Sequence, residues 1–253
     1  AMTANAQESD RARCLAAGMN DYVAKPFQQA TIQAMIDTWG GTPVSSSPDT
    51  PDQPVAPTPA KPAEPVFDRD SGKGSLTAGN SSPITDGAAG CWVATKAGLA
   101  RLPTGTPYAR LVDYEVSAVD FHTEGLLMAP AYGIPRLLAR NRLSFADIGL
   151  WEIHEAFASQ VLANVAAISD PEWVRTKAGV QAAMGDFNWD RVNPNGGSVA
   201  IGHPFGATGA RDLSQAVKEL WAMPPGSRAI VSICADGGQG TVALLERPWM
   251  GDQ

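Results

Sequence analysis

Three residues of this sequence combine types and positions that could do chemistry: His154, His203 and Cys234. His203 lies in a glycine-rich stretch, residues 193–211, where small residues let the backbone approach a ligand closely. His154 follows an apolar segment, residues 148–153, that predicts a strand, and ligands of α/β folds bind at the carboxyl ends of strands. Cys234 ends a second apolar segment. An imidazole beside a thiol predicts nucleophilic or acid–base chemistry, because the imidazole lowers the effective pKa of the thiol.

Taken singly, each of the three residues also fits a structural role, as a loop histidine, a helix-capping side chain or a small buried apolar residue. Other familiar motifs fail on spacing. The segment His154–Ala158 lacks the second histidine of a zinc-protease helix, and Ser198 lacks the final glycine of a nucleophile elbow. The Gly72–Ser75 segment lacks the upstream glycine of a P-loop, since position 67 is Phe. We therefore expect no metal site and no bound nucleotide cofactor.

Composition excludes several classes of protein. The 253 residues carry 19 Lys and Arg against 26 Asp and Glu, a formal net charge of −7, so the sequence lacks the basic footprint of a nucleic-acid or anionic-membrane binder. Three widely spaced cysteines exclude a disulfide framework and suit a reducing cytoplasm. The uncharged run 192–210 is rich in Gly, Asn and Pro, and charges interrupt the first 25 residues, so we expect neither a membrane span nor a signal peptide.

Changes in composition divide the chain into zones. Residues 1–40 predict an αβα segment with a short strand at 21–24. Residues 41–66 predict an extended linker, because they hold eight of the 20 prolines and too little apolar surface to fold. Residues 67–250 carry most of the glycine and aromatic content, and we divide them into 67–107 and 108–250.

The third zone predicts an α/β fold with a mixed sheet and helices on both faces. Apolar spacing predicts strands and helices in the order βαβαβαββ from about residue 108. Four of the five strands are expected at 112–118, 148–153, 228–234 and 241–246, and the helices at 134–140, 157–168 and 213–220; the strand between the last two helices has no residues assigned to it. A further helix is expected over 88–99, with Cys91 and Trp92 on its apolar face.

Four segments, taken together and in order, resemble the C-terminal signatures of the thiolase family. They are TAGNSSPITDGAAG (77–90), EIHEAFASQ (152–160), NPNGGSVAIGHPFGATGAR (193–211) and SICADGGQGTVALLE (232–246). The resemblance covers about residues 67–250. It implies that 67–107 end the thiolase N-terminal half, that 108–250 form the C-terminal domain, and that the activity is acyl-CoA C-acyl transfer, the Claisen cleavage or condensation of 3-ketoacyl-CoA.

The same resemblance implies roles for individual residues. His203 takes the proton of a cysteine nucleophile, Cys234 moves the α-proton of the second acyl-CoA, and His154 helps to hold the thioester oxygen. Three more residues contact substrate or coenzyme A in this comparison: Ser82, Phe157 and Gly237. Coenzyme A enters as substrate, so no resident cofactor is expected. A histidine at 154, where many thiolases have Asn, resembles the branch that handles longer 3-ketoacyl chains.

Two departures from the family pattern bear on activity. The nucleophilic cysteine of the family lies in its N-terminal half, and neither Cys14 nor Cys91 has the required context. Asp236 stands where the family has Gly or Ala donating a backbone N–H to an oxyanion hole. We therefore expect these residues to be inactive by themselves, with a thiolase N-terminal half or a second copy in a homodimer as partner.

Residues 2–27, MTANAQESDRARCLAAGMNDYVAKPF, resemble the last third of a bacterial response-regulator receiver domain. The resemblance makes Thr3 the switch hydroxyl and Lys25 the phosphate-contacting lysine, whereas the phosphoacceptor aspartate and the acidic metal pair are missing. We interpret the chain as a receiver remnant, a linker and a thiolase half. The alternatives are a phosphorelay fragment with a passenger thiolase half and a fusion product without function.

Overall fold

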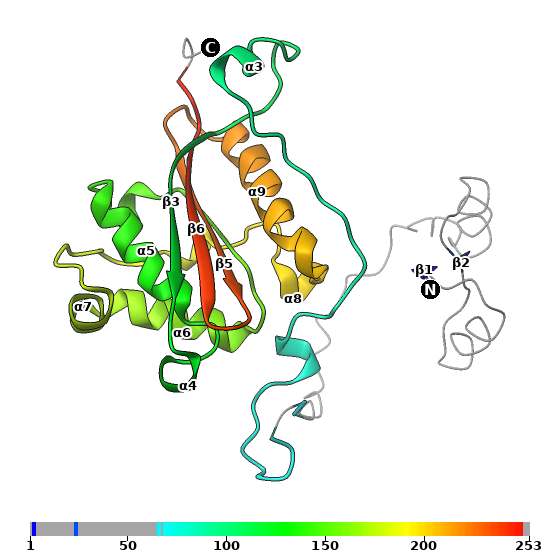
Figure 1. The fold of residues 1–253 in the computed structure, drawn as a ribbon, viewed down its shortest axis with the longest axis vertical. Helices are drawn as coiled ribbons and strands as arrows, with labels where there is room; N and C mark the ends of the chain where they lie inside the picture. The colour runs from blue at the N-terminus through cyan, green and yellow to red at the C-terminus, as the bar shows by residue number, and fades with distance from the viewer. Residues whose placement is uncertain (1, 4–22, 25–64, 67, 250–253) are drawn as a thin grey trace, which may run out of the picture. The chain divides into compact units, whose positions relative to one another are not determined.

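The computed structural model describes residues 2–3, 23–24, 65–66 and 68–249 (Figure 1). The chain divides into two compact units, Ala1–Ala60 and Lys61–Gln253. In the first unit, β1 (Met2–Thr3) pairs in parallel with β2 (Val23–Ala24), with Thr3 opposite Ala24. The strand predicted at 21–24 is thus confirmed for residues 23–24. Lys25, the helices predicted within residues 1–40 and nearly all of the linker lie outside the described residues.

The second unit is built on a four-stranded mixed sheet in the order β3-β6-β5-β4. Its strands are β3 (Arg110–Ala118), β4 (Leu150–Ile153), β5 (Arg228–Ala235) and β6 (Gln239–Glu246). β4 runs parallel to β5, and β6 is antiparallel to both β5 and β3. All four strands confirm segments that apolar patterning predicted, and the mixed α/β fold is confirmed with them.

Helices cover both faces of this sheet, as predicted. α5 (Ala129–Arg140) and α6 (Ala158–Ser169) lie on one face and α9 (Phe205–Ala222) lies on the other (Figure 1). Successive strand residues point to opposite faces, so Trp151 packs in the core under α5 and α6, while Leu150 packs under α9 with Leu220. The sheet therefore holds two separate apolar cores.

Short elements complete the second unit. They are η1 (Ala78–Asn80), α3 (Lys96–Leu99), α4 (Phe121–Glu124), η2 (Phe145–Asp147), α7 (Pro171–Trp173), η3 (Val174–Ala178), η4 (Trp189–Arg191) and α8 (Ser198–Ile201). No helix among the described residues is both long and apolar enough to cross a membrane.

The prediction of a helix over residues 88–99 is wrong for most of that range. Only α3, at its end, is helical, and Cys91 is exposed rather than packed on a helix face. Trp92 and Val93 are 98% and 92% exposed. A helix this short gains its stability from packing an apolar face, and these side chains have no surface to pack against.

The predicted order βαβαβαββ contains one strand too many. Between α6 and α9, only Val192 makes an isolated parallel bridge, to Trp151 of β4. The next residue, Asn193, has a φ of +44°, which ends the extended conformation after this single pair. The sheet therefore stops at β4 with one bridge beyond it.

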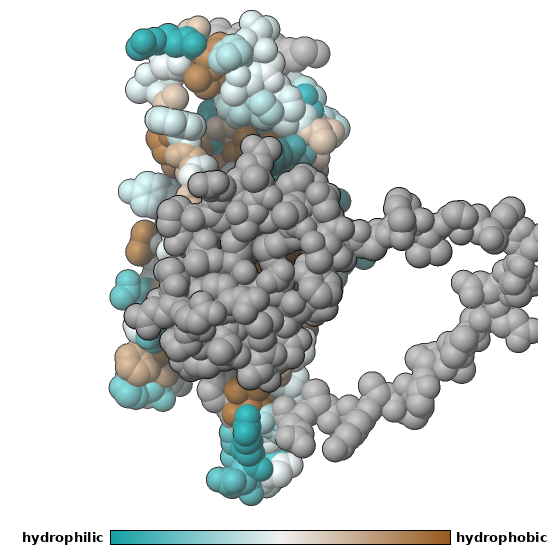
Figure 2. Space-filling view, turned by 90° about the vertical axis from the view of Figure 1, so that its right-hand side faces the viewer, coloured by the Kyte–Doolittle hydropathy of each residue, from teal (hydrophilic) through white to brown (hydrophobic). Residues whose placement is uncertain are grey.

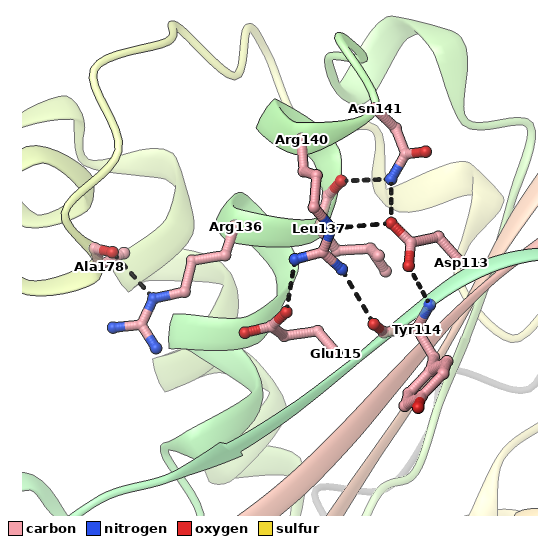
Figure 3. A network of polar contacts seen from close by, with 8 residues as sticks. All are labelled: Asp113, Tyr114, Glu115, Arg136, Leu137, Arg140, Asn141 and Ala178. Atoms are coloured by element: carbon pink, nitrogen blue, oxygen red, sulfur yellow. Dashed lines mark hydrogen bonds and ion pairs between the residues drawn. The ribbon is translucent and has the colours of Figure 1, made fainter.

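Edge strand β3 is fastened to the end of α5 by one arginine. Arg140 donates to Asp113 Oδ2 at 2.9 Å, to Glu115 Oε2 at 2.7 Å and to the Tyr114 carbonyl at 2.9 Å (Figure 3). Chiefly because of the Arg140 hydrogen bond, the pKa of Asp113 falls to about 2. The other face of β3 is open, since Tyr114 and Val116 are 61% and 63% exposed.

The crossing of α5 over the sheet depends on Gly133. A Cβ at this position would lie 2.8 Å from Ser117 Oγ and 3.2 Å from Val242 Cγ2. Ser117 Oγ is buried and has no hydrogen-bond partner among the described residues. We expect Gly133→Ala to lower the free energy of unfolding by about 1–3 kcal/mol through overpacking, although alanine alone would favour the helix by about 1 kcal/mol.

Removing the obstructing oxygen with Ser117→Ala should recover part of this loss in the double variant. The matched control is Gly206→Ala in α9, where a Cβ would meet nothing within 4 Å. Urea unfolding followed by circular dichroism measures all four proteins. Equal effects of Gly133→Ala and Gly206→Ala would contradict the packing argument.

Candidate functional site

The structure brings two of the predicted residues, His154 and His203, side by side. Their ring centroids are 4.3 Å apart and their planes are tilted by 36°. His154 follows β4 directly, and its backbone N–H still donates to Ser232 of β5 at 2.8 Å. His203 lies between α8 and α9, and its backbone N–H donates to Pro83 at 2.9 Å. These rings therefore mark the place where three segments meet: the carboxyl end of β4, the glycine-rich loop and the 81–85 segment.

A buried hydroxyl holds each imidazole through Nδ1. His154 Nδ1 lies 2.8 Å from Ser198 Oγ, and His203 Nδ1 lies 2.8 Å from Thr208 Oγ1. Both hydroxyl-bearing residues are buried almost completely. Sequence reasoning considered Ser198 only as a nucleophile and did not consider Thr208 at all. Both lie within the 193–211 signature, which was the available signal.

Glu155 and Asn193 join the segment after β4 to the glycine-rich loop. The Asn193 side chain accepts from Ile153 N–H at 2.8 Å and donates to the Ile153 carbonyl at 2.9 Å and to Glu155 Oε1 at 2.5 Å. Glu155 Oε2 in turn accepts from Val199 N–H at 3.0 Å. A Cβ at Gly197 would lie 2.2–2.4 Å from the Glu155 carboxylate, so a larger residue there would displace the carboxylate from these hydrogen bonds.

Both imidazoles are uncharged at neutral pH. Burial lowers the pKa of His154 to about 4, and the neighbouring His203 and Arg211 add to the effect. Burial and the Arg211 charge also lower the pKa of His203. A neutral imidazole has one N–H donor and one bare nitrogen that accepts a proton, so this pair can offer both functions without carrying charge.

Cys234 lies near the end of β5 and is buried. Burial raises the pKa of its thiol to about 11, and hydrogen bonds from the backbone amides of Cys234 and Ala156 oppose this only in part. The side chain is therefore a protonated thiol at neutral pH, next to the backbone of the segment that follows His154. The expected contact between Cys234 and His203 stays a prediction.

Ser82 and Phe157 lie along the same segment. Ser82 donates from both its backbone N–H and its hydroxyl to the Ala156 carbonyl, at 3.0 Å each. Ser81 and Phe157 form an antiparallel bridge, and Phe157 caps the start of α6. These residues dock the 81–85 segment beside the histidines; their contacts with a substrate remain predictions.

Gly237 lies in the turn between β5 and β6 with a φ of +79°, a conformation that favours glycine. Its backbone N–H donates to Asp236 Oδ1 at 2.8 Å. Asp236, the residue that departs from the family pattern, thus accepts a hydrogen bond from the adjacent backbone amide. Among the described residues, no group of three or more His, Cys, Asp or Glu side chains could hold a metal ion.

The family described as "Thiolase, C-terminal domain" matches residues 105–247. The 3-ketoacyl-CoA thiolase of Photorhabdus laumondii subsp. laumondii is 40% identical over 182 residues, which are 72% of this chain and 41% of the relative. The chain thus spans about two fifths of the length of this relative.

Solved structures agree with the sequence match. The dimeric peroxisomal thiolase of Saccharomyces cerevisiae superposes with a TM-score of 0.54 at 31% identity, covering 74% of this chain and 41% of that one. The Acat5 thiolase from Ascaris suum, in complex with coenzyme A, superposes with a TM-score of 0.52 at 31% identity, covering 73% and 42%.

Buried ionisable side chains lie near the histidine pair, and one of them, Arg211, lowers the pKa of both histidines. Glu152 of β4 is 1% exposed, and its Oε1 has no hydrogen-bond partner among the described residues. Burial and the nearby Glu219 and Asp212 carboxylates raise the pKa of Glu152 to about 8. Burial also raises the pKa of Asp212, to about 6, although Asp212 pairs with Arg211. Glu152 is therefore held as the neutral acid at pH 7.

This raised pKa links stability to pH. The folded chain keeps a proton on Glu152 up to about pH 8, whereas the unfolded chain loses it near 4.5, so Glu152 lowers stability as pH rises through this window. Glu152→Gln stays neutral throughout. We expect the variant to gain more than about 1 kcal/mol over the wild type between pH 5 and pH 8.

Denaturant unfolding at pH 5, 6.5 and 8 measures this difference. The control is Glu172→Gln, because Glu172 is an exposed carboxylate beside Arg175 and its removal should change stability only slightly. Parallel stability curves for Glu152→Gln and the wild type would show that Glu152 ionises normally in the folded chain.

Proposed function

This chain belongs to the thiolase family, and from that premise we propose that residues 108–250 form the acid–base side of an acyl-CoA C-acyltransferase site. The proposed reaction is the reversible cleavage of 3-ketoacyl-CoA by coenzyme A. The observation that carries the proposal is the neutral pair His154 and His203, 4.3 Å apart at the end of the sheet. The curated relative that matches this region is a 3-ketoacyl-CoA thiolase, and a superposed relative binds coenzyme A.

In cleavage, a cysteine thiolate adds to the 3-keto carbon, and the bond between C2 and C3 then breaks. The electron pair of that bond passes into the enolate of the leaving acetyl thioester. We assign the thiol of Cys234 as the acid that returns a proton to C2, which completes acetyl-CoA. The acyl group stays on the nucleophilic cysteine until the thiol of coenzyme A, losing its own proton, displaces it.

The electrostatics of the described residues support these roles. The lowered pKa of His203 leaves a bare nitrogen at neutral pH, which can take the proton of the nucleophilic thiol. The raised pKa of Cys234 keeps its proton available for the carbanion. His154 is neutral and buried, so its N–H can donate to the thioester oxygen where negative charge develops. Ser82, Phe157 and Gly237 are proposed to contact the coenzyme A arm.

We further propose that these 253 residues require a partner for turnover. Most of the length of the relatives has no counterpart in the aligned region, and the nucleophilic cysteine is expected there. The surface also carries exposed apolar side chains, and patches of hydrophobic residues are visible in Figure 2. Trp92, Tyr114 and Val116 are among the exposed apolar residues. Exposed apolar surface of this kind favours association. A thiolase N-terminal half fits this requirement, as does a second copy, since the yeast relative is dimeric.

The free thiols of Cys91 and Cys234 suit the cytoplasm.

A reconstitution assay tests the function. We expect no cleavage of 3-ketoacyl-CoA by the chain alone, and measurable acetyl-CoA formation after a separately expressed N-terminal half of the Photorhabdus relative is added. In that mixture, His203→Ala and Cys234→Ala should each lower turnover at least about a hundredfold, because each removes a proton-transfer group. His122→Ala is the matched control, since His122 of α4 has no assigned role in proton transfer.

Asp236→Gly adds a second arm to this assay. It frees the Gly237 N–H from the Asp236 carboxylate and removes a charge that would oppose a developing enolate, so turnover should rise. The positive control is the relative divided at the same point. Activity from its two halves, with none from the mixture containing this chain, would refute the proposed activity.

For residues 2–27 we propose descent from a receiver domain without phosphorelay activity. The parallel pairing sets Thr3 opposite Ala24, the residue before Lys25. The segment that resembles a receiver contains no phosphoacceptor aspartate, so acetyl phosphate with magnesium should leave it unmodified. Intact-mass spectrometry measures this, with an active receiver domain as control. A phosphoryl adduct within the first 40 residues would contradict the proposal.

A further inference from the structure

His203 lies in a short loop, residues 202–204, between the end of α8 and the start of α9. A largely exposed segment from much earlier in the sequence, residues 81–87 (the strap), runs along this loop. We propose that the strap is a positioning element for His203, and that the contact between Gly87 and Pro204 seats it.

The backbone of His203 meets the strap on both of its polar groups. Its N–H donates to the Pro83 carbonyl at 2.9 Å, and its carbonyl faces the Thr85 N–H at 3.5 Å. Ile84, between these two residues, forms a parallel bridge with His203. Since only φ and ψ are free to rotate in the backbone, these contacts restrain the direction in which the imidazole leaves the chain.

Close packing fixes the strap against the two residues that flank His203. A Cβ at Gly202 would lie 2.6 Å from Thr85 Oγ1 and Cγ2, and a Cβ at Gly87 would lie 2.7 Å from Cβ and Cγ of Pro204. The proline ring is closed on its own backbone, so it cannot swing aside as a long side chain can. An added Cβ at Gly87 would therefore push the strap and the loop apart.

The other end of the strap is anchored beside His154. Ser82 donates from its backbone N–H and its hydroxyl to the Ala156 carbonyl, at 3.0 Å each. The strap thus connects the segment that follows His154 with the loop that carries His203. Under the proposed function Ser82 also contacts the coenzyme A arm, so the segment that meets the substrate also holds the base. This link rests on the proposed function, whereas the seating of the strap does not.

The test uses the full chain labelled with ¹⁵N-histidine, which gives three backbone amide signals because the sequence has three histidines. Replacing each histidine in turn with Gln assigns the signals. His154 N–H donates to Ser232 of β5 and is the protected reference, whereas His122 N–H donates to the exposed Asp120 side chain. We expect the wild-type His203 N–H to exchange with solvent at least about tenfold more slowly than that of His122.

Gly87→Ala should unseat the strap, because the strap is exposed and moves more easily than the start of α9. We expect exchange of the His203 N–H to accelerate at least about tenfold, with the His154 N–H unchanged. The matched control is Gly90→Ala, where an added Cβ meets nothing within 4 Å and the wild-type rate should persist. Neither glycine has a positive φ, so the two substitutions differ in the contact that they make.

A second pair of variants removes a contact instead of adding one. Thr85→Gly deletes the side chain that packs on Gly202 and should also accelerate exchange of the His203 N–H. Ile84→Gly gives the backbone the same added freedom, but the Ile84 side chain is 77% exposed, so its effect should be clearly smaller. Far-UV circular dichroism shows whether each variant keeps the fold.

The same label reports on the imidazole itself. The ring nitrogen signals of His203 should shift in Gly87→Ala and stay in place in Gly90→Ala. A wild-type His203 N–H that exchanges as fast as that of His122 would overturn the proposal, as would equal rates in the two glycine variants. Faster exchange without a shift of the ring signals would show that the strap does not position the imidazole.

The reconstitution assay adds a functional readout. Gly87→Ala should lower kcat by about tenfold or more, because a displaced base no longer meets the thiol at the right distance. KM should change by less than about threefold, since Ser82 keeps its anchor on Ala156. Gly90→Ala should change neither constant. Exchange and ring signals are measured without turnover, so failure of the strap and failure of the proposed activity remain distinguishable.

Discussion

The arrangement of the histidine pair depends on the side-chain amide of Asn193, which makes the hydrogen bonds to β4 that a neighbouring strand would otherwise make. Asn193 bonds both the N–H and the carbonyl of Ile153, which completes the hydrogen bonding of β4 where the sheet ends. Its third contact, to Glu155, ties in the start of α8 through Val199. Directed hydrogen bonds thereby join the segment after β4 to the glycine-rich loop. This joint acts together with the Val192–Trp151 bridge and the hydrogen bond between Ser198 and His154.

The same joint accounts for the glycines around it. At Gly197 the Glu155 carboxylate occupies the space of a Cβ, and Gly202 has a φ of +103° with Thr85 atoms 2.6 Å from the position of a Cβ. Glycine here allows loops to come together at a distance that other residues forbid. The glycine-rich stretch is thus a packing requirement of the site, in addition to any approach to a ligand.

Apolar patterning predicted the sheet and its covering helices because α5, α6 and α9 bury one face each, β3 and β6 alternate in burial, and β4 and β5 are buried along most of their length. It failed for residues 88–99, since periodicity cannot show whether a surface exists for Trp92 to pack against. It also overlooked the hydrogen bonds of Glu155, Ser198 and Thr208. The bonds of Glu155 and Ser198 join loops about 40 residues apart, and the bond of Thr208 depends on its position in a helix. Neither kind of bond leaves a periodic signal in the sequence. The signature segments located the site, and only the structure showed how its parts support one another.

Neutrality is the constraint that shapes the chemistry of this site. The two ring centroids are 4.3 Å apart in a partly buried region, so two protonated imidazoles would repel each other. The positive charge of Arg211 makes protonation of even one ring unfavourable. A proton that His203 accepts from a thiol therefore creates an ion pair with the resulting thiolate, and that pair is stabilised only while both charges are adjacent. The described residues supply the imidazole and its supporting hydroxyl. Under the proposed function, the charge distribution of the site thus favours proton transfer only while the thiol lies beside the imidazole.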